Sequence, residues 1–294
     1  MLTPLDYSYN ATKNVQTQNF YSNVFKECIL TKKQSSEHKT TIKINNSIIG
    51  EKSLIIIAGP CAIESYEQMV NIGLFLKKLG VSILRGSAYK PRTSPYSFQG
   101  FGLEALKWHK EAQLVHKLII ETEILDPRDI ETVCQYVDIL RIGARNMQNF
   151  PLLKEASLSK KPIILKRGFS STLYEWLLSA EYILNYGNPQ VILCERGIRT
   201  FETAHRFTLD FTGAAIIKNF SHLPIIIDPS HAAGNRELVP SLTKAALNLG
   251  VDGVLIEVHA TPDQSLCDGP QALSLEMFEK LIADIKMFPS LSYI

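Results

Sequence analysis

The sequence predicts a (β/α)8 TIM barrel with a short N-terminal extension. From residue 53 onward, short runs rich in β-branched residues alternate with longer segments of helical periodicity. The runs are apolar almost throughout, which is typical of parallel strands that are buried on both faces. Eight such units in about 240 residues fit a barrel, for which about 250 residues is typical. The runs are 53–61, 81–87, 117–125, 138–144, 161–168, 190–197, 223–231 and 252–259.

A doubly wound open sheet is the alternative fold. It usually has fewer strands and a glycine-rich nucleotide-binding turn, and no GxGxxG follows the first run here. Helical periodicity is clearest in residues 66–80 and 171–187, and Gly187 is placed to end the second helix. This regular alternation favours the barrel.

The first 50 residues differ from the rest of the chain. Residues 1–40 are polar and predict a loosely ordered arm with a short helix near 19–30. Residues 41–50 alternate between polar and apolar, with Asn45 and Asn46 in the middle, which predicts a β-hairpin. We expect this hairpin to cover the bottom of the barrel or to form a subunit contact. The predicted organisation is an arm and hairpin over 1–50 and a catalytic barrel over 51–294.

The composition excludes several classes of partner. With 31 basic and 29 acidic residues the chain carries a net charge of +2, too little for a nucleic-acid-binding field. The apolar runs are too short to span a bilayer, and the N-terminus lacks the pattern of a signal peptide. Five widely spaced cysteines without a CxxC argue against a disulfide framework. We therefore predict a cytoplasmic protein with small-molecule ligands and without nucleic-acid or membrane partners.

Basic residues gather where the predicted strands end, and in a barrel these ends form the catalytic face. Arginine forks suit phosphate and carboxylate oxygens, and lysine supplies a point charge. Each cation alone is as well explained by a solvated rim charge or a salt bridge. Together they predict a site for two phosphates and a carboxylate. The set is Arg85, Lys90, Arg92, Arg145, Lys166, Arg196 and Arg199.

A second group of strand-end residues has the chemistry of metal ligands. It combines Cys61, His231, Glu257 and Asp268, from the first, seventh and eighth units. A thiolate, an imidazole and two carboxylates suit a divalent transition ion such as Mn, Fe, Co or Zn. The alternative is that Cys61 is an inert buried residue and that His231 is structural.

Eight motifs identify the chain with a known family. They resemble 3-deoxy-D-arabino-heptulosonate 7-phosphate (DAHP) synthase, in the short microbial branch that is similar to 3-deoxy-D-manno-octulosonate 8-phosphate synthase. The resemblance covers residues 50–290. It implies a transferase of the shikimate pathway to aromatic amino acids, which condenses phosphoenolpyruvate with erythrose 4-phosphate. The motifs are IAGPCAIES, LRGSAYKPRTSPYSFQGFG, TEILDPRDIE, IGARNMQNFPLLKE, ILKRG, CERGIRTFE, IIIDPSHAAG and VLIEVHATPDQSLCDGPQAL.

The resemblance also assigns roles to residues. It implies one divalent metal ion on Cys61, His231, Glu257 and Asp268, and a sugar phosphate at the segment Lys90-Pro91-Arg92-Thr93. It implies that phosphoenolpyruvate is held by Arg85, Lys90, Ala144, Arg145, Lys166 and Arg196.

The mechanism that we expect needs an acid and a base. Lys90 is the expected proton donor to the forming hydroxyl, because it lies between the two substrates. The base that activates water is a metal-bound water, Asp228 or Glu123, and the sequence leaves this choice open. Arg141 departs from the family pattern, in which we expect a neutral polar residue. If it faces the barrel interior, Glu123 or Asp138 is its expected partner.

Two other functions are weighed against DAHP synthesis. The octulosonate synthase uses arabinose 5-phosphate and carries a KANRS-type loop, whereas this chain has KPRTS at 90–94, which favours the four-carbon sugar. A non-catalytic barrel that senses a phosphometabolite need not keep a metal set together with both anion sites. The family implies a homo-oligomer, a homotetramer or a dimer. Residues 1–40 match neither regulatory extension of this branch, which puts feedback control in doubt.

Overall fold

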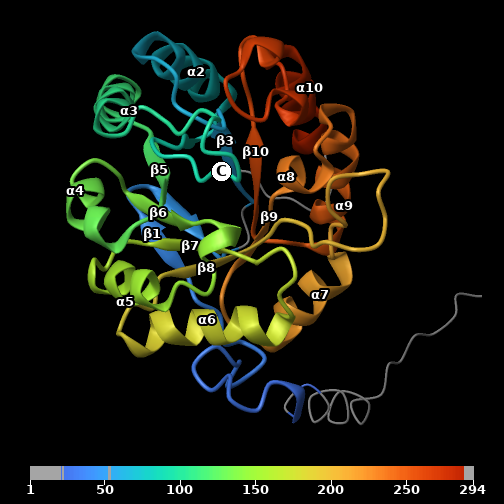
Figure 1. The fold of residues 1–294 in the computed structure, drawn as a ribbon. Helices are drawn as coiled ribbons and strands as arrows, with labels where there is room; N and C mark the ends of the chain where they lie inside the picture. The colour runs from blue at the N-terminus through green and yellow to red at the C-terminus, as the bar shows by residue number, and fades with distance from the viewer. Residues whose placement is uncertain (1–20, 22, 52–53, 288–294) are drawn as a thin grey trace, which may run out of the picture.

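The computed structural model describes residues 21, 23–51 and 54–287. Eight parallel strands close into a barrel in the order β10-β3-β4-β5-β6-β7-β8-β9, which confirms the predicted fold (Figure 1). Neighbours in sequence are neighbours in space, and the barrel closes where β10 pairs with β3. The strands are β3 (Ile55–Gly59), β4 (Ile83–Arg85), β5 (Ile119–Ile124), β6 (Ile139–Ile142), β7 (Ile163–Lys166), β8 (Val191–Glu195), β9 (Ile225–Ile227) and β10 (Gly253–Glu257).

Helices surround the barrel, and short 3-10 helices lie in the connections (Figure 1). The helices are α2 (Tyr66–Leu79), α3 (Leu103–His116), α4 (Ile130–Cys134), α5 (Phe150–Leu158), α6 (Leu173–Asn185), α7 (Phe211–Phe220), α8 (Pro229–Ala233), α9 (Val239–Leu249) and α10 (Leu275–Lys286). The 3-10 helices are η1 (Pro127–Asp129), η2 (Ala144–Asn146), η3 (Arg236–Leu238), η4 (Pro262–Gln264) and η5 (Gly269–Gln271).

Local sequence signals set the ends of both helices predicted above. The side chain of Ser65 accepts a hydrogen bond from the backbone of Gln68 at the start of α2, and Gly80 ends that helix in the left-handed conformation. Thr172 and Glu175 form a capping box at the start of α6. Gly187, at φ +83°, follows the end of α6 as predicted.

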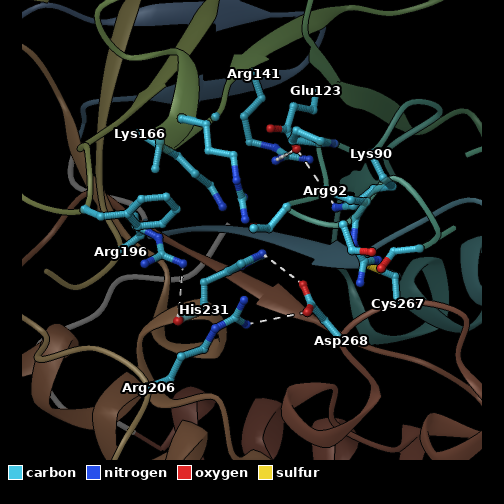
Figure 2. Close-up of a pocket in the computed structure, with 18 residues that line it drawn as sticks. Lys90, Arg92, Glu123, Arg141, Lys166, Arg196, Arg206, His231, Cys267 and Asp268 are labelled. Atoms are coloured by element: carbon cyan, nitrogen blue, oxygen red, sulfur yellow. Dashed lines mark hydrogen bonds and ion pairs between the residues drawn. The ribbon is translucent and has the colours of Figure 1, made fainter. Parts of the chain in front are cut away.

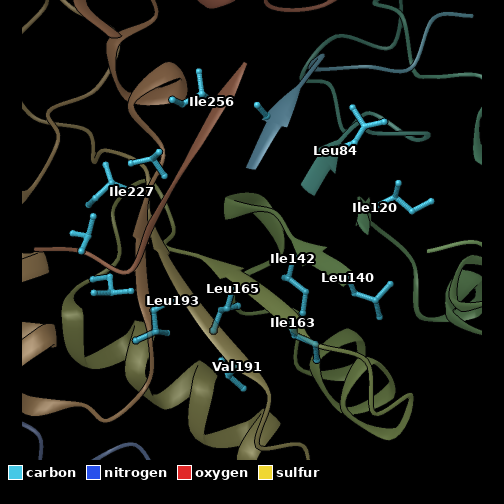
Figure 3. Close-up of a cluster of buried hydrophobic side chains, with 14 of the residues drawn as sticks. Leu84, Ile120, Leu140, Ile142, Ile163, Leu165, Val191, Leu193, Ile227 and Ile256 are labelled. Carbon is cyan, nitrogen blue, oxygen red and sulfur yellow. The ribbon is translucent and has the colours of Figure 1, made fainter. Parts of the chain in front are cut away.

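Alternation along the strands produces two apolar layers and one charged layer. Outward-facing residues such as Leu84, Leu140 and Leu193 pack in the core against the helices (Figure 3). Inward-facing aliphatic residues, mostly isoleucines, fill the lower part of the barrel. Because side chains alternate along a strand, the residue two positions after each of the uppermost of these inward-facing barrel residues also faces inward, one layer higher. This upper layer is buried and mostly charged: Arg85, Glu121, Arg141, Lys166, Cys194, Asp228 and Glu257.

A β-hairpin closes the bottom of the barrel. It consists of β1 (Ile42–Ile44) and β2 (Ser47–Ile49), which pair antiparallel, and Asn45 in the turn has φ +52°. An asparagine tolerates that left-handed conformation better than most residues. The side chains of Ile42, Ile44 and Ile49 join the lower aliphatic layer. The hairpin therefore covers the barrel bottom, the first of the two places expected for it.

Only part of the N-terminal arm can be compared with the prediction. Residues 1–20 and 22 lie outside the described residues. Of the helix predicted near 19–30, Tyr21, Asn23 and Val24 are helical. Residues 30–40 run along the bottom of the barrel, where the backbone of Lys33 donates to Phe220 and that of Thr40 to His222. Among the described residues, no helix has the length and apolar character that crossing a membrane requires.

Candidate active site

A cavity of about 300 Å³ lies at the carboxyl ends of the barrel strands (Figure 2). Most of the residues predicted to bind substrate line it, because they lie at the carboxyl ends of the barrel strands or in the loops that follow these ends. The predicted residues in its wall are Lys90, Arg92, Thr93, Ala144, Arg145, Lys166, Arg196, His231 and Asp268. The other charged or aromatic residues in the wall are Glu123, Arg141, Phe169 and Arg206.

Two predicted cations do not line this cavity. Arg85 is fully buried beneath it, and its Nη2 lies 3.0 Å from Oε1 of Glu257. Arg199 is exposed on the loop after β8, with its guanidinium carbon 5.3 Å from the centre of the Phe169 ring. Arg85 therefore pairs with Glu257 beneath the cavity, whereas Arg199 lies outside it.

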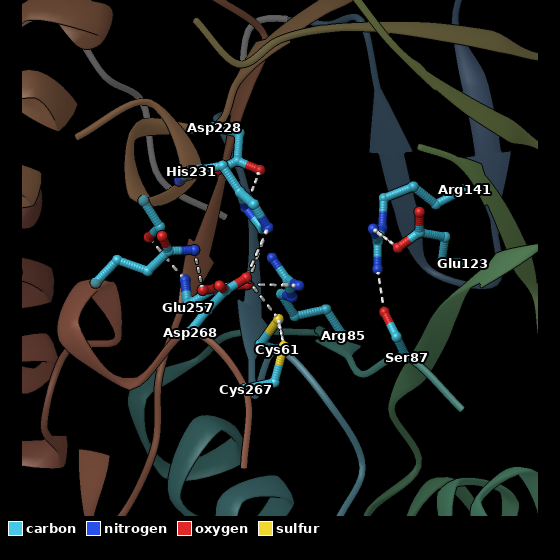
Figure 4. A network of polar contacts seen from close by, with 12 residues as sticks. Cys61, Arg85, Ser87, Glu123, Arg141, Asp228, His231, Glu257, Cys267 and Asp268 are labelled. Atoms are coloured by element: carbon cyan, nitrogen blue, oxygen red, sulfur yellow. Dashed lines mark hydrogen bonds and ion pairs between the residues drawn. The ribbon is translucent and has the colours of Figure 1, made fainter. Parts of the chain in front are cut away.

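The four predicted metal ligands come together at one edge of the cavity (Figure 4). Their donor atoms all lie within 4.8 Å of one another. The Cys61 Sγ is 3.2 Å from Oδ2 of Asp268, and Nε2 of His231 is 3.3 Å from Oε1 of Glu257. Cys61 follows β3, His231 lies on α8, Glu257 ends β10, and Asp268 lies in the next loop.

Asp228 orients the imidazole of His231. This aspartate caps α8, where its Oδ1 accepts a hydrogen bond from the backbone of His231, and its Oδ2 lies 2.8 Å from Nδ1 of the ring. Nε2 is thereby turned toward Glu257 and Asp268. Burial lowers the pKa of His231 to about 4. A neutral ring with a carboxylate on the far nitrogen is the usual arrangement of a metal-binding histidine.

The donor set fits a divalent transition metal ion. Oε2 of Glu257 accepts a hydrogen bond from Gln271, but its buried Oε1 has no hydrogen-bond partner among the described residues. Oε1 is instead paired with Arg85, whose Nη2 lies 3.0 Å away, so the carboxylate stays charged and a lone pair of this oxygen can still bind a metal ion. A hydrogen bond with Cys267 and burial raise the pKa of Cys61, so the thiol keeps its proton until a metal replaces it.

The cations around the cavity are only partly compensated. Lys166 has a carboxylate partner in Asp228, yet burial lowers its pKa below the ordinary value. Burial also lowers the pKa of Arg196 to about 10. Its guanidinium carbon lies 4.1 Å from the centre of the Phe207 ring and 4.8 Å from that of Phe169. These aromatic faces hold Arg196 in place without neutralising it, which leaves its charge for an anionic ligand.

Inward and outward positions separate binding residues from structural ones. Lys166 faces the cavity, whereas the next residue, Arg167, faces outward and donates to Glu195 and Asp210 at 2.9 and 2.8 Å. Because consecutive residues of a strand point to opposite faces, only one member of such a pair reaches the cavity. Arg167 therefore ties the strand ends to α7.

Of the two partners expected for Arg141, the structure confirms Glu123 and not Asp138. Arg141 faces the barrel interior and donates to Glu123 at 3.0 Å, as predicted. The prediction of Asp138 is wrong, since that carboxylate accepts from Gln113 and from the backbone of Ile120. Asp138 and Arg141 are three positions apart, so they point to opposite faces of the strand.

Three wall residues escaped the sequence reasoning. Arg206, from the loop after β8, lies 3.6 Å from Oδ1 of Asp268. Cys267 lies 3.4 Å from Cys61 and accepts a hydrogen bond from Arg92 at 3.0 Å. Phe169 carries no charge that would single it out. Proximity in sequence to Asp268 was the only signal for Cys267, and Arg206 lies far from any predicted strand end.

Comparisons with known proteins agree with this geometry. Residues 30–288 match the DAHP synthetase I family. A phospho-2-dehydro-3-deoxyheptonate aldolase of Thermotoga maritima is 48% identical over 263 residues, which are 90% of this chain and 78% of that protein. A 2-dehydro-3-deoxyphosphooctonate aldolase of Desulfosudis oleivorans is 31% identical over 264 residues, which are 82% of this chain and 93% of that protein.

Solved structures give the same relationship. The crystal structure of the Thermotoga maritima DAHP synthase superposes with a TM-score of 0.85 at 48% identity, covering 87% of this chain and 75% of that one. A truncated form of the enzyme from the same organism gives a TM-score of 0.82 at 45% identity, covering 87% and 94%. Family match, sequence identity and fold lead to one conclusion: the chain belongs to the DAHP synthetase I family.

Proposed function

We propose that this protein is a DAHP synthase, which condenses phosphoenolpyruvate and erythrose 4-phosphate with water to give DAHP and inorganic phosphate. The observation that carries the proposal is a cation-lined cavity directly beside a buried Cys-His-Glu-Asp group at the catalytic face of a barrel. Both substrates carry phosphate, and phosphoenolpyruvate adds a carboxylate. The cavity supplies cations for all three groups.

Phosphoenolpyruvate belongs in the inner half of the cavity. There Arg145, Lys166 and Arg196 converge with the backbone of Ala144, and Arg85 adds its charge from below. The phosphate of the sugar belongs at the outer side, against Arg92 and Thr93 of the loop after β4. Holding two anions face to face lowers the entropic barrier of the condensation, by up to about 7–11 kcal/mol for well-oriented reactants.

The four-residue group would hold one divalent ion, and Mn, Fe, Co and Zn all suit its donors. Such an ion polarises the aldehyde oxygen of the sugar when bound. The protein's own contribution is to place Cys61, His231, Glu257 and Asp268 around one point. Asp228 fixes the ring of His231 for this purpose.

Lys90 is the proposed proton donor to the forming hydroxyl. Burial lowers the pKa of its ammonium, but the sulfur of Cys61, which a bound metal would hold as a thiolate, and the carboxylate of Glu123 more than offset this, so the pKa lies above the ordinary value. Lys90 therefore enters the reaction protonated. The electron pair of the C2=C3 double bond of phosphoenolpyruvate forms the bond from C3 to the aldehyde carbon and leaves C2 electron-poor, and the aldehyde oxygen takes the proton from Lys90.

Glu123 is the proposed base for water. Asp228 is fully buried, and its two oxygens are taken by His231 and Lys166. Glu123 lines the cavity, and no hydrogen bond to its Oε1 is found among the described residues. Water adds to C2 and gives its proton to Glu123. The tetrahedral product then loses phosphate through cleavage of the C2–O bond, and the proton of the C2 hydroxyl leaves with the phosphate as the ketone forms.

The finer biological setting is also part of the proposal. We place the enzyme in the cytoplasm as a homo-oligomer, a tetramer or a dimer, on the strength of the family resemblance. The five cysteines are free thiols, in keeping with a reducing compartment. The catalytic residues all belong to the barrel, proposed to span 51–294.

Phosphate release tests the choice of substrate. We expect the manganese-loaded protein to release phosphate from phosphoenolpyruvate with erythrose 4-phosphate and to stop after chelation. Arabinose 5-phosphate is the informative comparison, because an octulosonate aldolase is among the relatives at 31% identity. Turnover with the five-carbon sugar alone would assign the octulosonate reaction. No release with either sugar would contradict catalysis altogether.

A further inference from the structure

Arg141 lies inside the barrel and reaches the inner wall of the cavity, and all its guanidinium nitrogens are bonded (Figure 4). Nε donates to Oε2 of Glu121 at 2.9 Å, and Nη1 donates to Oε2 of Glu123 at 3.0 Å. Nη2 donates to the hydroxyl of Ser87 at 2.7 Å, in the segment that follows β4. One side chain of β6 thus connects three neighbouring parts of the barrel.

Arg141 offsets the buried negative charge of two neighbouring glutamates. Glu121 and Glu123 are two positions apart on β5, so both point into the barrel. Two buried carboxylates on one face disfavour each other's charged form. Lys90 approaches only one of them, with Nζ at 4.0 Å from Oε2 of Glu123. Arg141 is the cation that contacts both, so it balances the charge of the pair.

The carboxylate of Glu123 has one anchored oxygen and one oxygen left for the cavity (Figure 2). Oε2 is shared between Arg141 and Lys90. Oε1 lies over Gly143, where a Cβ atom would come within 1.9 Å of it. Glycine at 143 therefore leaves the space that Oε1 occupies, and both residues line the cavity.

We propose that Arg141 is a positioning residue for the condensation, holding Glu123 ionised and oriented as the base on the cavity floor. This inference rests on the proposed function and deepens it. In the proposed reaction Arg141 touches neither substrate, so it is a positioning residue and not a catalytic one. It acts through Glu123, whose anchored oxygen fixes the direction of the other.

Charged groups from several elements surround Glu123. Burial raises its pKa, and Arg141 of β6 gives the largest opposing effect, followed by Lys90, Lys166 of β7 and His231 of α8. The net pKa lies below the ordinary value, so Glu123 is a carboxylate at neutral pH. Without Arg141, the charge of the neighbouring glutamate is no longer offset, and the pKa of Glu123 rises.

The decisive experiment compares Arg141→Gln with Glu121→Gln/Arg141→Gln in the metal-loaded enzyme. For Arg141→Gln we expect kcat to fall about 100-fold, the lower end of what a general base contributes. The acid limb of its kcat–pH profile moves upward, because one glutamate now takes up a proton. The double variant removes the opposing charge as well, so at least tenfold of the lost kcat returns.

An infrared measurement tests the same point without turnover. Arg141→Gln gains the band of a protonated carboxyl group at neutral pH, and the wild type and the double variant lack it. If the wild type is inactive with both sugars, the proposed function fails, but the band still shows whether Arg141 keeps the buried carboxylates ionised. If the wild type is active and Arg141→Gln shows neither the band nor a shifted profile, the inference is overturned.

Arg167→Gln is the matched control. Arg167 is also buried between two carboxylates, Glu195 and Asp210, but it faces away from the cavity. Its loss destabilises the fold and leaves the kcat–pH profile in place. Equal profile shifts in Arg141→Gln and Arg167→Gln would reduce Arg141 to a structural role and overturn the proposal.

Discussion

Two arginines in the cavity wall, Arg92 and Arg196, are assigned to different substrates. Arg92 comes from the loop after β4 and is held by Cys267, whereas Arg196 directly follows β8 and is held between Phe169 and Phe207. Their supports differ, so their contributions are separable by mutation. In the proposed scheme, Arg92 serves the sugar phosphate and Arg196 serves phosphoenolpyruvate.

Replacing Arg92 by alanine tests this division. A hydrogen bond to a charged group contributes about 1.5–3 kcal/mol, so we expect the KM for erythrose 4-phosphate to rise about 10- to 100-fold. The KM for phosphoenolpyruvate stays within about threefold. Steady-state phosphate release with each substrate varied in turn measures both. Arg196→Ala is the matched variant, with the opposite split expected, and a rise in the KM for phosphoenolpyruvate alone in Arg92→Ala would contradict the assignment.

Sequence reasoning works for residues whose place follows from strand ends. Arg145, Lys166 and Asp268 were predicted at the catalytic face and line the cavity. Cys267 was not recognised as part of it, because its contact with Cys61 spans 206 positions of the chain. Such a contact depends on how two loops fold over the barrel, which no local pattern in one sequence encodes.

Among the elements, the hairpin shows that two short strands can be predicted from sequence while the surface they pack against cannot. Alternation and an Asn-Asn turn predict two strands, and β1 and β2 confirm them. What the hairpin covers depends on the lower aliphatic layer, which exists only once the barrel has closed. The predicted run 81–87 likewise contains a strand of only Ile83–Arg85, after which Ser87 bonds Arg141.

Ile49→Ala tests the role of the hairpin. Ile49 is fully buried against the barrel bottom, so we expect its truncation to lower the free energy of unfolding by about 2–5 kcal/mol. The active site lies at the other end of the barrel, so kcat at saturating substrate stays near the wild-type value. Urea unfolding and phosphate release measure the two quantities. Ile48→Ala, half-buried on the other face of β2, is the control, and an equal loss in both variants would contradict the packing role.

At the scale of the whole molecule, the candidate metal-binding group of Cys61, His231, Glu257 and Asp268 lies where the first and last barrel strands pair and close the barrel. Cys61 follows β3, the first barrel strand, and Glu257 ends β10, the last. The two strands pair in register from Gly253 with Ile55 to Glu257 with Gly59. An ion on this group would therefore join the two ends of the barrel sequence. Binding to the folded state alone stabilises that state by mass action.

Metal removal is thus expected to weaken the entire barrel. A free metal ion concentration of 100 times the Kd adds about 2.7 kcal/mol to the free energy of unfolding. For a chain of this size that corresponds to a rise in Tm of about 5 °C. Scanning calorimetry with and without chelator measures the shift. Cys61→Ala removes a ligand of the candidate metal-binding group and should abolish both the shift and bound metal, whereas Cys134→Ala, on α4 away from the group, should keep them. If Cys61→Ala showed the same metal-dependent shift in Tm as the wild type, the assignment would be contradicted. The ion would then be bound elsewhere and would not join β3 to β10.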